Sequence, residues 1–584
     1  MPVLDSIRRL GFGRTESVDD YLGVLIPLED AHLYSHATRS EKSAQHGPLD
    51  EEDETGPVKD GDSERQGMLE MSETEYTIEN LRREMRRGAR EWTDYEIKSK
   101  LVNKAIQDIG MGSYNWQLFV LCGFGWFADN LWLQGVSLTL PSLSAEFDIS
   151  EKTVRYTTSA LYVGLSAGSV LWGVGSDSLG RRIAFNATLL ITCVFGTLSA
   201  YAPGWGSVCF LFAALGTGVG GNLPVDGALF LEFLPDASSA MLTLLSVWWP
   251  VGQLASSLVA WYFMGQWPVE EGWRYFVLAI GIITFIMFAI RCFGFHLFES
   301  PKFLLNKGRQ EEAVAVVHGI AYRNHTKTWL TSEIMDQVAA GDSGEQRQQS
   351  QASLVPAAVL REKMRNFSME RLRPLFKTKT LGLATGLVWF CWAAVGMGFP
   401  LFTAFLPQYF AHHGNDPSDA GGLQSETSTI SDTTYRNYAI TSVVGVPGSL
   451  LAAYLVDHPS PFLGRRGTLA SSTLVSAVFL FLFVQYGTTS TAQLIFSCVV
   501  AFFSNISYAV LYTITPEMFP APVRGAGSGV ASFLNRMTGL MAPVLAANVP
   551  GSGATPVYCS AALVLAAFVA MCLIPIETRG TQKL

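Results

Sequence analysis

The sequence predicts an all-α membrane protein in which twelve transmembrane helices form two pseudo-symmetric six-helix bundles. Of the 584 residues, 49% are hydrophobic and only 16% are charged, and the mean hydropathy is +0.24. A soluble protein of this length usually carries about 25% charged residues. The charged residues gather in the first hundred positions and in one central segment, so the remainder is strongly apolar. A short sequence also occurs twice, once in each half, which indicates two similar halves.

The repeated sequence is a short polar turn between two apolar runs. Its first copy is residues 173–182, Gly-Val-Gly-Ser-Asp-Ser-Leu-Gly-Arg-Arg. Gly180 permits a tight connection because glycine accepts positive φ. The second copy has Asp457 and then residues 464–466, Gly-Arg-Arg, with six inserted residues between them. Two arginines at this place in each half indicate that both turns lie on the cytoplasmic side.

The chain begins with a long polar region. Residues 1–75 are acidic and poor in aromatic residues, so we expect a disordered cytoplasmic N-terminal tail. Residues 76–113 form a basic, amphipathic, cytoplasmic helical segment, with apolar residues at helical spacing over 95–109. This helix could lie on the inner leaflet or dock on the underside of the protein itself. The pattern favours neither arrangement.

Twelve apolar runs follow, each long enough to cross a hydrocarbon core of about 30 Å at about 1.5 Å per residue. Six belong to an N-terminal bundle, residues 114–298, and six to a C-terminal bundle, residues 381–576. Residues 299–380 form a polar cytoplasmic central loop, far longer than ordinary connections, and residues 577–584 form a cytoplasmic C-terminal tail. The runs are expected near residues 116–140, 154–175, 183–202, 207–234, 241–264, 274–298, 381–410, 436–456, 467–487, 492–514, 525–549 and 555–576.

Lysine and arginine in the connections predict the orientation. The basic helix, both repeated turns and the central loop fall on one side, whereas residues 411–435 on the other side contain no lysine or arginine. The positive-inside rule therefore places both termini in the cytoplasm, and we expect a monomer in the plasma membrane. The eight cysteines lie in apolar runs without the spacing of a metal site. We expect no cofactor, no metal, no nucleic-acid partner and no enzymatic activity.

Several sequences resemble the major facilitator superfamily, and within it the sugar-porter branch. The first repeated turn is similar to the family's G-x-x-x-D-x-x-G-R-R between its second and third helices. Residues 299–305, 516–525 and 575–580 are similar to P-E-S-P-R-x-L, E-x-F-P-x-x-x-R-G and P-E-T-K-G. Residues 109–116 and 220–235 are most similar to synaptic-vesicle-two-related proteins and bacterial niacin carriers. The resemblance implies the major facilitator fold and transport by alternating access.

The resemblance also implies charged residues that close the cytoplasmic side. It pairs Arg181 with Glu232 and Arg465 with Glu517, and it places Asp177 against the positive amino end of the eleventh span. We expect these contacts to act as a latch that exists only while this side is closed; the alternative is a static scaffold. The predicted gate comprises Asp177, Arg181, Arg182, Glu232, Asp457, Arg465, Arg466, Glu517 and Arg524.

Three charged residues lie deep within the spans. Asp129 is about thirteen residues into the first span, Asp226 lies deep in the fourth and Arg536 is about twelve residues into the eleventh. Ionised groups at this depth cost several kcal/mol unless they are paired or hydrated. We predict that Asp129, more than Asp226, carries a coupling proton; the alternative is a buried acid bonded to a neighbouring helix. Arg536 either holds a substrate carboxylate or neutralises an aspartate, and Arg291 is expected to snorkel to the cytoplasmic surface.

Amide side chains would complete a binding site. Gln253 matches a glutamine of the fifth span that binds substrate in sugar porters, and Asn222 and Gln408 are further candidates. We therefore expect a proton-coupled symporter of a small polar organic solute, with an organic acid or nicotinate-like anion favoured because of Arg536. The alternatives are an uncoupled facilitator of a sugar or polyol, and a membrane sensor that keeps the fold without transport.

Overall fold

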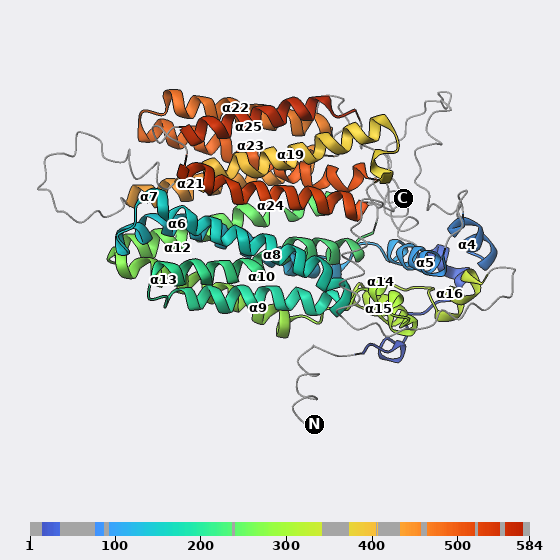
Figure 1. Ribbon diagram of the computed structural model, residues 1–584. Coiled ribbons are helices and arrows are strands. Elements are labelled where there is room, and N and C mark those ends of the chain that lie inside the picture. Colours follow the sequence, from blue (N-terminus) through green and yellow to red (C-terminus); the bar gives the residue numbers. More distant parts are fainter. Residues whose placement is uncertain are drawn as a thin grey trace, which may run out of the picture.

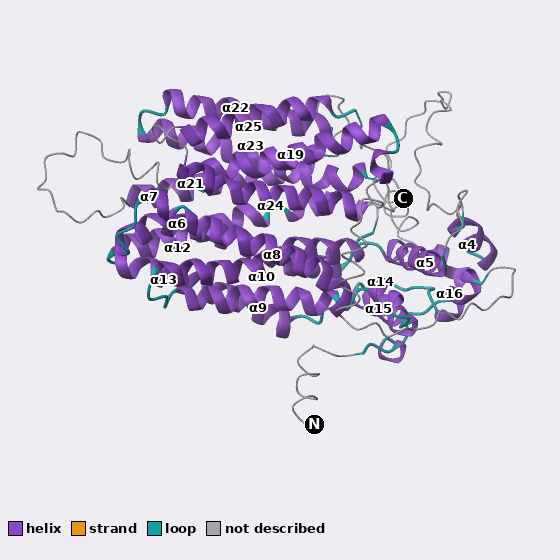
Figure 2. Cartoon of the chain, in the orientation of Figure 1, coloured by secondary structure: helices purple, strands orange, loops and turns teal. Residues whose placement is uncertain are grey.

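The structure is a computed structural model. It describes residues 15–34, 76–86, 93–235, 240–340, 373–404, 406, 432–456, 464–519, 524–548 and 555–575. In these ranges the regular elements are helices, with one isolated β-bridge between Leu25 and Thr328 (Figure 2). The all-α prediction is confirmed.

The long helices form two bundles that lie side by side, with their axes nearly parallel (Figure 1). The first bundle contains α6 (Ser113–Glu146), α8 (Tyr156–Leu179), α9 (Arg181–Ser199), α10 (Trp205–Glu232), the pair α11 (Ala240–Leu245) and α12 (Trp248–Gln266), and α13 (Val269–Ala289). The second contains α19 (Lys379–Thr403), α21 (Asp432–Leu455), α22 (Arg465–Tyr486), α23 (Ser490–Met518), α24 (Arg524–Asn548) and α25 (Thr555–Leu573). Ten segments of the described chain are long and apolar enough to span a membrane, and α6 and α8 complete the twelve.

The two bundles contact each other through α8 with α24 and through α12 with α21. One end of the assembly carries α5 (Asp94–Ile109), α14 (Pro301–Asn306), α15 (Gln310–Arg323) and α16 (Ser332–Ala339), and the other carries α7 (Glu151–Val154) (Figure 1); we call them the α5 end and the α7 end. Hydrogen bonds between the bundles join Thr243 to Thr513 (2.6 Å), Ser257 to Ser442 (3.3 Å) and Asn548 to Tyr156 (2.9 Å).

The sixth span ends earlier than its hydrophobicity suggests. The helix α13 passes into a π-helical turn, η5 (Ile290–Gly294), and the chain is extended at Phe295, so the helix does not reach the predicted residue 298. The apolar residues beyond the turn, Leu297 and Phe298, are buried against the domain at the α5 end. Their hydrophobicity thus reflects protein packing and not contact with lipid.

The domain at the α5 end is built from segments that precede and follow the first bundle in the sequence. It comprises α4 (Ile78–Met85), α5 (Asp94–Ile109), α14 (Pro301–Asn306), α15 (Gln310–Arg323) and α16 (Ser332–Ala339). The apolar stripe of α5, including Ile97, Leu101 and Ala105, is buried, and α5 packs against α14, α15 and α16. Of the two arrangements left open by the sequence, the structure shows the helix docked on the protein itself.

A buried carboxylate ties α5 to this domain. Asp108 accepts hydrogen bonds from Tyr76 (3.1 Å) and from the indole of Trp329 (2.8 Å), and its Oδ1 lies 3.1 Å from Nζ of Lys104. Burial raises the pKa of Asp108, although Lys104 and the two hydrogen bonds act in the opposite direction. The segment 299–380 is therefore not a loop throughout, because its first part packs with α5 around buried apolar side chains that are continuous with those of the first bundle.

The prediction of disorder is wrong for residues 15–34. This segment forms η2 (Val18–Asp20), η3 (Leu28–Asp30) and α2 (Ala31–Tyr34), and η2 packs against α15. Val24 and Ile26 are buried, and the bridge to Thr328 satisfies their backbone. Composition alone could not predict these contacts, because they join residues about 300 positions apart in the chain.

Candidate functional site

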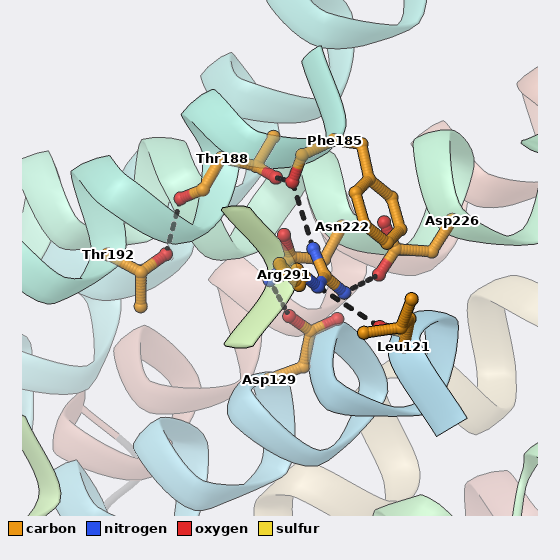
Figure 3. Close-up of polar contacts among 8 residues, drawn as sticks. All are labelled: Leu121, Asp129, Phe185, Thr188, Thr192, Asn222, Asp226 and Arg291. Carbon is orange, nitrogen blue, oxygen red and sulfur yellow. Dashed lines mark hydrogen bonds and ion pairs between the residues drawn. The ribbon is translucent and has the colours of Figure 1, made fainter. Parts of the chain in front are cut away.

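Asp129, on α6, is one of two acids that the structure shows buried within the spans of the first bundle. The amide nitrogen of Asn222, on α10, donates to Oδ1 of Asp129 at 2.8 Å, and both side chains are almost fully buried (Figure 3). Among the described residues, Oδ2 of Asp129 has no hydrogen-bond partner. A carboxylate held by one amide donor, with its second oxygen unused, has a place for a proton.

The second deep acid, Asp226, lies in an ion pair. Oδ2 of Asp226 is 2.7 Å from the guanidinium of Arg291, and both side chains have 0% exposure. Arg291 also donates to the carbonyl oxygens of Leu121 (3.0 Å) and Phe185 (2.9 Å), and it lies 3.7 Å from the centre of the Phe185 ring (Figure 3). The prediction that Arg291 snorkels is wrong, because one carboxylate, two carbonyls and an aromatic face satisfy its charge inside the bundle.

The ion pair depends on a glycine in the neighbouring helix. A Cβ added to Gly125 of α6 would lie 1.8 Å from Oδ2 of Asp226 and 2.8 Å from Nη2 of Arg291. Arg291 itself projects from the π-helical turn η5, and such turns often mark functional positions in helices. The close approach of α6, α10 and η5 therefore requires the absence of a side chain at Gly125.

We predict that Gly125→Ala destabilises the protein by about 1–3 kcal/mol, because the methyl group must displace a buried ion pair. Thermal unfolding in detergent measures the effect as a lower Tm. Gly227→Ala is the matched control, because among the described residues its Cβ would meet only Trp126, at 3.8 Å. Equal shifts in Tm for the two variants would contradict the requirement for close approach at Gly125.

Arg536, on α24, is the deep cation of the second bundle. It donates to the carbonyl oxygen of Leu165, on α8 of the first bundle, at 2.7 Å, and its side chain is 6% exposed. No ion pair joins Arg536 to a carboxylate within the described part of the chain. It nevertheless lies within electrostatic range of Asp129 and Tyr512. Arg536 therefore has further N–H donors that could bind an anion.

The candidate amides are placed differently. Gln253, on α12, donates to Oδ1 of Asn130 at 3.1 Å, next to Asp129 in sequence. Asn222 is the partner of Asp129, and its own Oδ1 has no hydrogen-bond partner among the described residues. Gln408 lies outside the described residues. Asn222 and Gln253 thus hold the α6 residues 129 and 130 from two sides.

Aromatic side chains from both bundles pack together, and two of them lie on the helices that carry Asp129 and Gln253. They were not among the site residues predicted from the sequence. Trp126 of α6 and Trp249 of α12 are stacked, with ring centres 4.8 Å apart and an interplanar angle of 12°. Tyr512 of α23 contacts both, at 6.0 and 5.0 Å, and Trp392 of α19 lies 4.6 Å from Tyr512. The cluster Trp126–Trp249–Tyr512–Trp392 therefore crosses the boundary between the two bundles.

The sequence did contain a signal for this cluster. Trp126 precedes Asp129 by three residues and Trp249 precedes Gln253 by four, and residues at these spacings share one face of a helix. Tryptophan is enriched at the ends of spans, and this tendency argued against a role for these residues within the spans.

The gate residues lie at the α5 end. Both ion pairs that the resemblance implies are present: Arg181 with Glu232 at 2.9 Å, between α9 and α10, and Arg465 with Glu517, between α22 and α23. Each pair lies within its own bundle. Asp457 and the side chains of Asp177 and Arg524 lie outside the described part of the chain.

The two remaining arginines bind backbone carbonyls. Arg182 is buried and donates to the carbonyl oxygen of Leu297 at 3.5 Å, and Arg466 donates to that of Cys572. These two contacts attach the amino ends of α9 and α22 to neighbouring segments within the same bundle.

Glu299 contacts two residues of the predicted gate, although the prediction did not include it. Its Oε1 accepts hydrogen bonds from the backbone nitrogens of Arg181 (2.9 Å) and Arg182 (3.2 Å) at the amino end of α9. A carboxylate is favourable there because it satisfies free N–H groups and interacts with the helix dipole. Gly180, with φ of +110°, lets the chain turn tightly before this end. Glu299 thus fixes the position from which Arg181 reaches Glu232.

We predict that Glu299→Ala loosens the amino end of α9 by about 1–2 kcal/mol, the usual cost of losing a helix cap. Hydrogen exchange of the first turn of α9 should accelerate about tenfold or more. Glu311→Ala is the control, because Glu311 is an exposed residue of α15. Unchanged exchange in α9 would show that Glu299 does not hold this end.

The comparisons with known proteins agree with this architecture. The Major Facilitator Superfamily model matches residues 118–543. The MFS siderochrome iron transporter 1 of Ceriporiopsis subvermispora (strain B) is 40% identical over 501 residues, covering 84% of this chain and 92% of the relative. The synaptic vesicle 2-related protein of Xenopus laevis is 30% identical over 494 residues, covering 82% and 81%.

A solved structure has the same fold. The proton:xylose symporter XylE of E. coli, bound to 6-bromo-6-deoxy-D-glucose, matches with a TM-score of 0.59 and 16% identity over 81% of this chain and 98% of that chain. The likeness at this identity concerns the fold alone. Together with the match to the family model and the relatives above, it shows that the chain is a multi-pass membrane protein of the major facilitator superfamily.

Proposed function

We propose that the protein is a proton-coupled symporter of a small polar organic solute that carries a carboxylate, with an organic acid or nicotinate-like anion favoured. The observation that carries the proposal is the pair of unmatched charges at mid-depth. Asp129 has one oxygen without a partner, and Arg536 has no carboxylate partner in the described chain. The two groups lie within electrostatic range of each other.

Charge balance explains how these two groups couple a proton to an anion. In the empty carrier, the negative Asp129 and the positive Arg536 offset each other. In the fully loaded carrier, a proton neutralises Asp129 and the substrate carboxylate neutralises Arg536. A carrier with only one of the two ligands holds an uncompensated charge at mid-bilayer depth, which costs several kcal/mol. Only the empty and the fully loaded carriers therefore change state readily.

Asp226 is the weaker candidate for the coupling proton. Its fixed partner Arg291 offsets its charge in every loading state, because the two side chains are fully buried and bonded at 2.7 Å. We assign the pair a structural role, in which the charge of Arg291 offsets that of Asp226, and we assign the coupling proton to Asp129.

The substrate would be bound between the bundles. Arg536 would hold its carboxylate as a planar fork, Asn222 and Gln253 offer amide groups, and the aromatic cluster offers ring faces for a flat, unsaturated solute. We place the α5 end, both termini and the central segment in the cytoplasm, and the protein in the plasma membrane as a monomer. The pairs Arg181–Glu232 and Arg465–Glu517 act as the latch of the cytoplasmic side. The proposal involves no cofactor and no enzymatic step.

Uptake into vesicles tests the proposal. Purified protein is reconstituted, a pH gradient is imposed, and labelled sugars, polyols and carboxylates selected by a thermal-shift screen are offered. We expect a carboxylate to accumulate only while the outside is acidic. Uptake that reaches equilibrium without accumulation would indicate an uncoupled facilitator of a sugar or polyol. Ligand binding without counterflow exchange would indicate a sensor.

A further inference from the structure

A short connector links the buried ion pair to the gate. Residues 295–299 join the π-helical turn that carries Arg291 to Glu299, which holds the amino end of α9. Midway along the connector, the carbonyl of Leu297 accepts a hydrogen bond from Arg182 at 3.5 Å. Any movement of the connector therefore acts on Arg291 at one end and on Glu299 at the other.

The N-terminal segment 15–34 grips this connector. Oε1 of Glu16 lies 2.7 Å from Nε2 of His296, and the hydroxyl of Tyr21 donates to Oε2 of Glu16 at 2.5 Å. The Tyr21 ring packs edge-on against Phe298, with ring centres 6.2 Å apart, and also contacts Tyr322 of α15 at 5.9 Å. Glu16 and Tyr21 thus hold the connector at two of its five residues.

The seat of this segment is small. Its buried apolar side chains are Val24, Ile26 and Ala31, and its backbone is joined to the domain through Thr328, which bonds to Val24 and Ile26 at 3.0 and 3.1 Å. Figure 1 shows the segment in dark blue at the edge of the domain, beside α15. A segment with so little buried surface has a low free energy of local unfolding, so it is expected to detach from the domain more often than the helices do.

We propose that residues 15–34 form a regulatory clamp on the gate. While the clamp is seated, the connector is fixed, Glu299 stays on the amino end of α9, and Arg181 stays within reach of Glu232. When the clamp is released, the connector moves and the contacts of Glu299 weaken, so Arg181 is no longer held within reach of Glu232. The effect on transport rate rests on the proposed function, whereas the mechanical link does not.

Hydrogen exchange of the full-length protein tests the link. Tyr21→Ala removes the contacts with Glu16, Phe298 and Tyr322, and Leu22→Ala is the matched control because Leu22 is 81% exposed. We expect Tyr21→Ala to accelerate exchange at residues 295–300 and in the first turn of α9 by tenfold or more. Leu22→Ala should leave both unchanged. Glu16→Gln and His296→Gln provide a second test, in which the double variant should accelerate exchange no more than either single variant.

The outcomes separate the clamp from transport. Faster exchange confined to residues 15–34, with the connector and α9 unchanged, overturns the clamp. Faster exchange at the connector and α9, together with a change in the rate of counterflow, supports both the clamp and transport. If the unaltered protein shows no counterflow, the proposed function fails, but the exchange of residues 295–300 still decides whether the clamp exists.

Discussion

Asp129→Asn should reduce accumulation driven by a pH gradient at least tenfold, while counterflow exchange of the substrate continues. Asparagine keeps the shape of the side chain and resembles the protonated, neutral acid. The loaded carrier can therefore change state without a proton, so the gradient no longer drives uptake. The amide can still bond to Asn222, which at present donates to Asp129 at 2.8 Å, so we expect the fold to be retained.

The measurement is uptake and counterflow in the same preparation of vesicles. Thr139→Val is the control, because Thr139 is also buried on α6 but, within the described residues, its hydroxyl bonds only to the carbonyl of Val136 in its own helix. We expect this variant to accumulate substrate as the unaltered protein does. Accumulation by Asp129→Asn that still follows the pH gradient would remove Asp129 from the coupling step.

Arg291→Met should destabilise the protein by about 3–5 kcal/mol, the usual cost of leaving one buried charge without its partner. The change strands Asp226 and also removes the donors to Leu121 and Phe185. Asp226→Asn in the same protein should restore part of the loss, because it removes the stranded charge. Thermal unfolding of the two single variants and the double variant gives the coupling between the residues.

Arg309→Met is the control for this experiment. Arg309 forms an ion pair with Glu312 in which the side chains are 45% and 23% exposed, and such surface pairs contribute about 0–1 kcal/mol. Arg291→Met should therefore lower Tm far more than Arg309→Met. Similar shifts in Tm for both variants would contradict the view that Arg291 is a buried counter-ion. They would favour a position of Arg291 at the membrane surface.

The sequence was a good guide wherever a feature depends on local pattern. Runs of apolar residues locate the helices because a span must be both long and apolar. The pairs Arg181–Glu232 and Arg465–Glu517 followed from the resemblance, since their two arginines lie in the short repeated turns. The depths of Asp129 and Arg536 also followed from counting residues along a helix.

The sequence was a poor guide wherever a feature depends on a partner distant in the chain. Arg291 near a helix end suggests snorkelling until Asp226 and Gly125 are seen beside it. The acidic N-terminal region suggests disorder, but residues 15–34 are held by His296 and Thr328. Periodicity shows which face of a helix is apolar, and it does not show which other element covers that face.

Accessibility of the mid-depth site from each face tests the central claim most directly. A single cysteine in place of Asn222, in a protein without its native cysteines, would be exposed to a membrane-impermeant thiol reagent in right-side-out and in inside-out vesicles. Asn222 contacts Asp129 directly, so its reactivity reports on the site. The account predicts labelling from both faces, with substrate and pH changing the ratio between them. Absence of labelling from either face under every condition would contradict a carrier that opens this site alternately to the two sides.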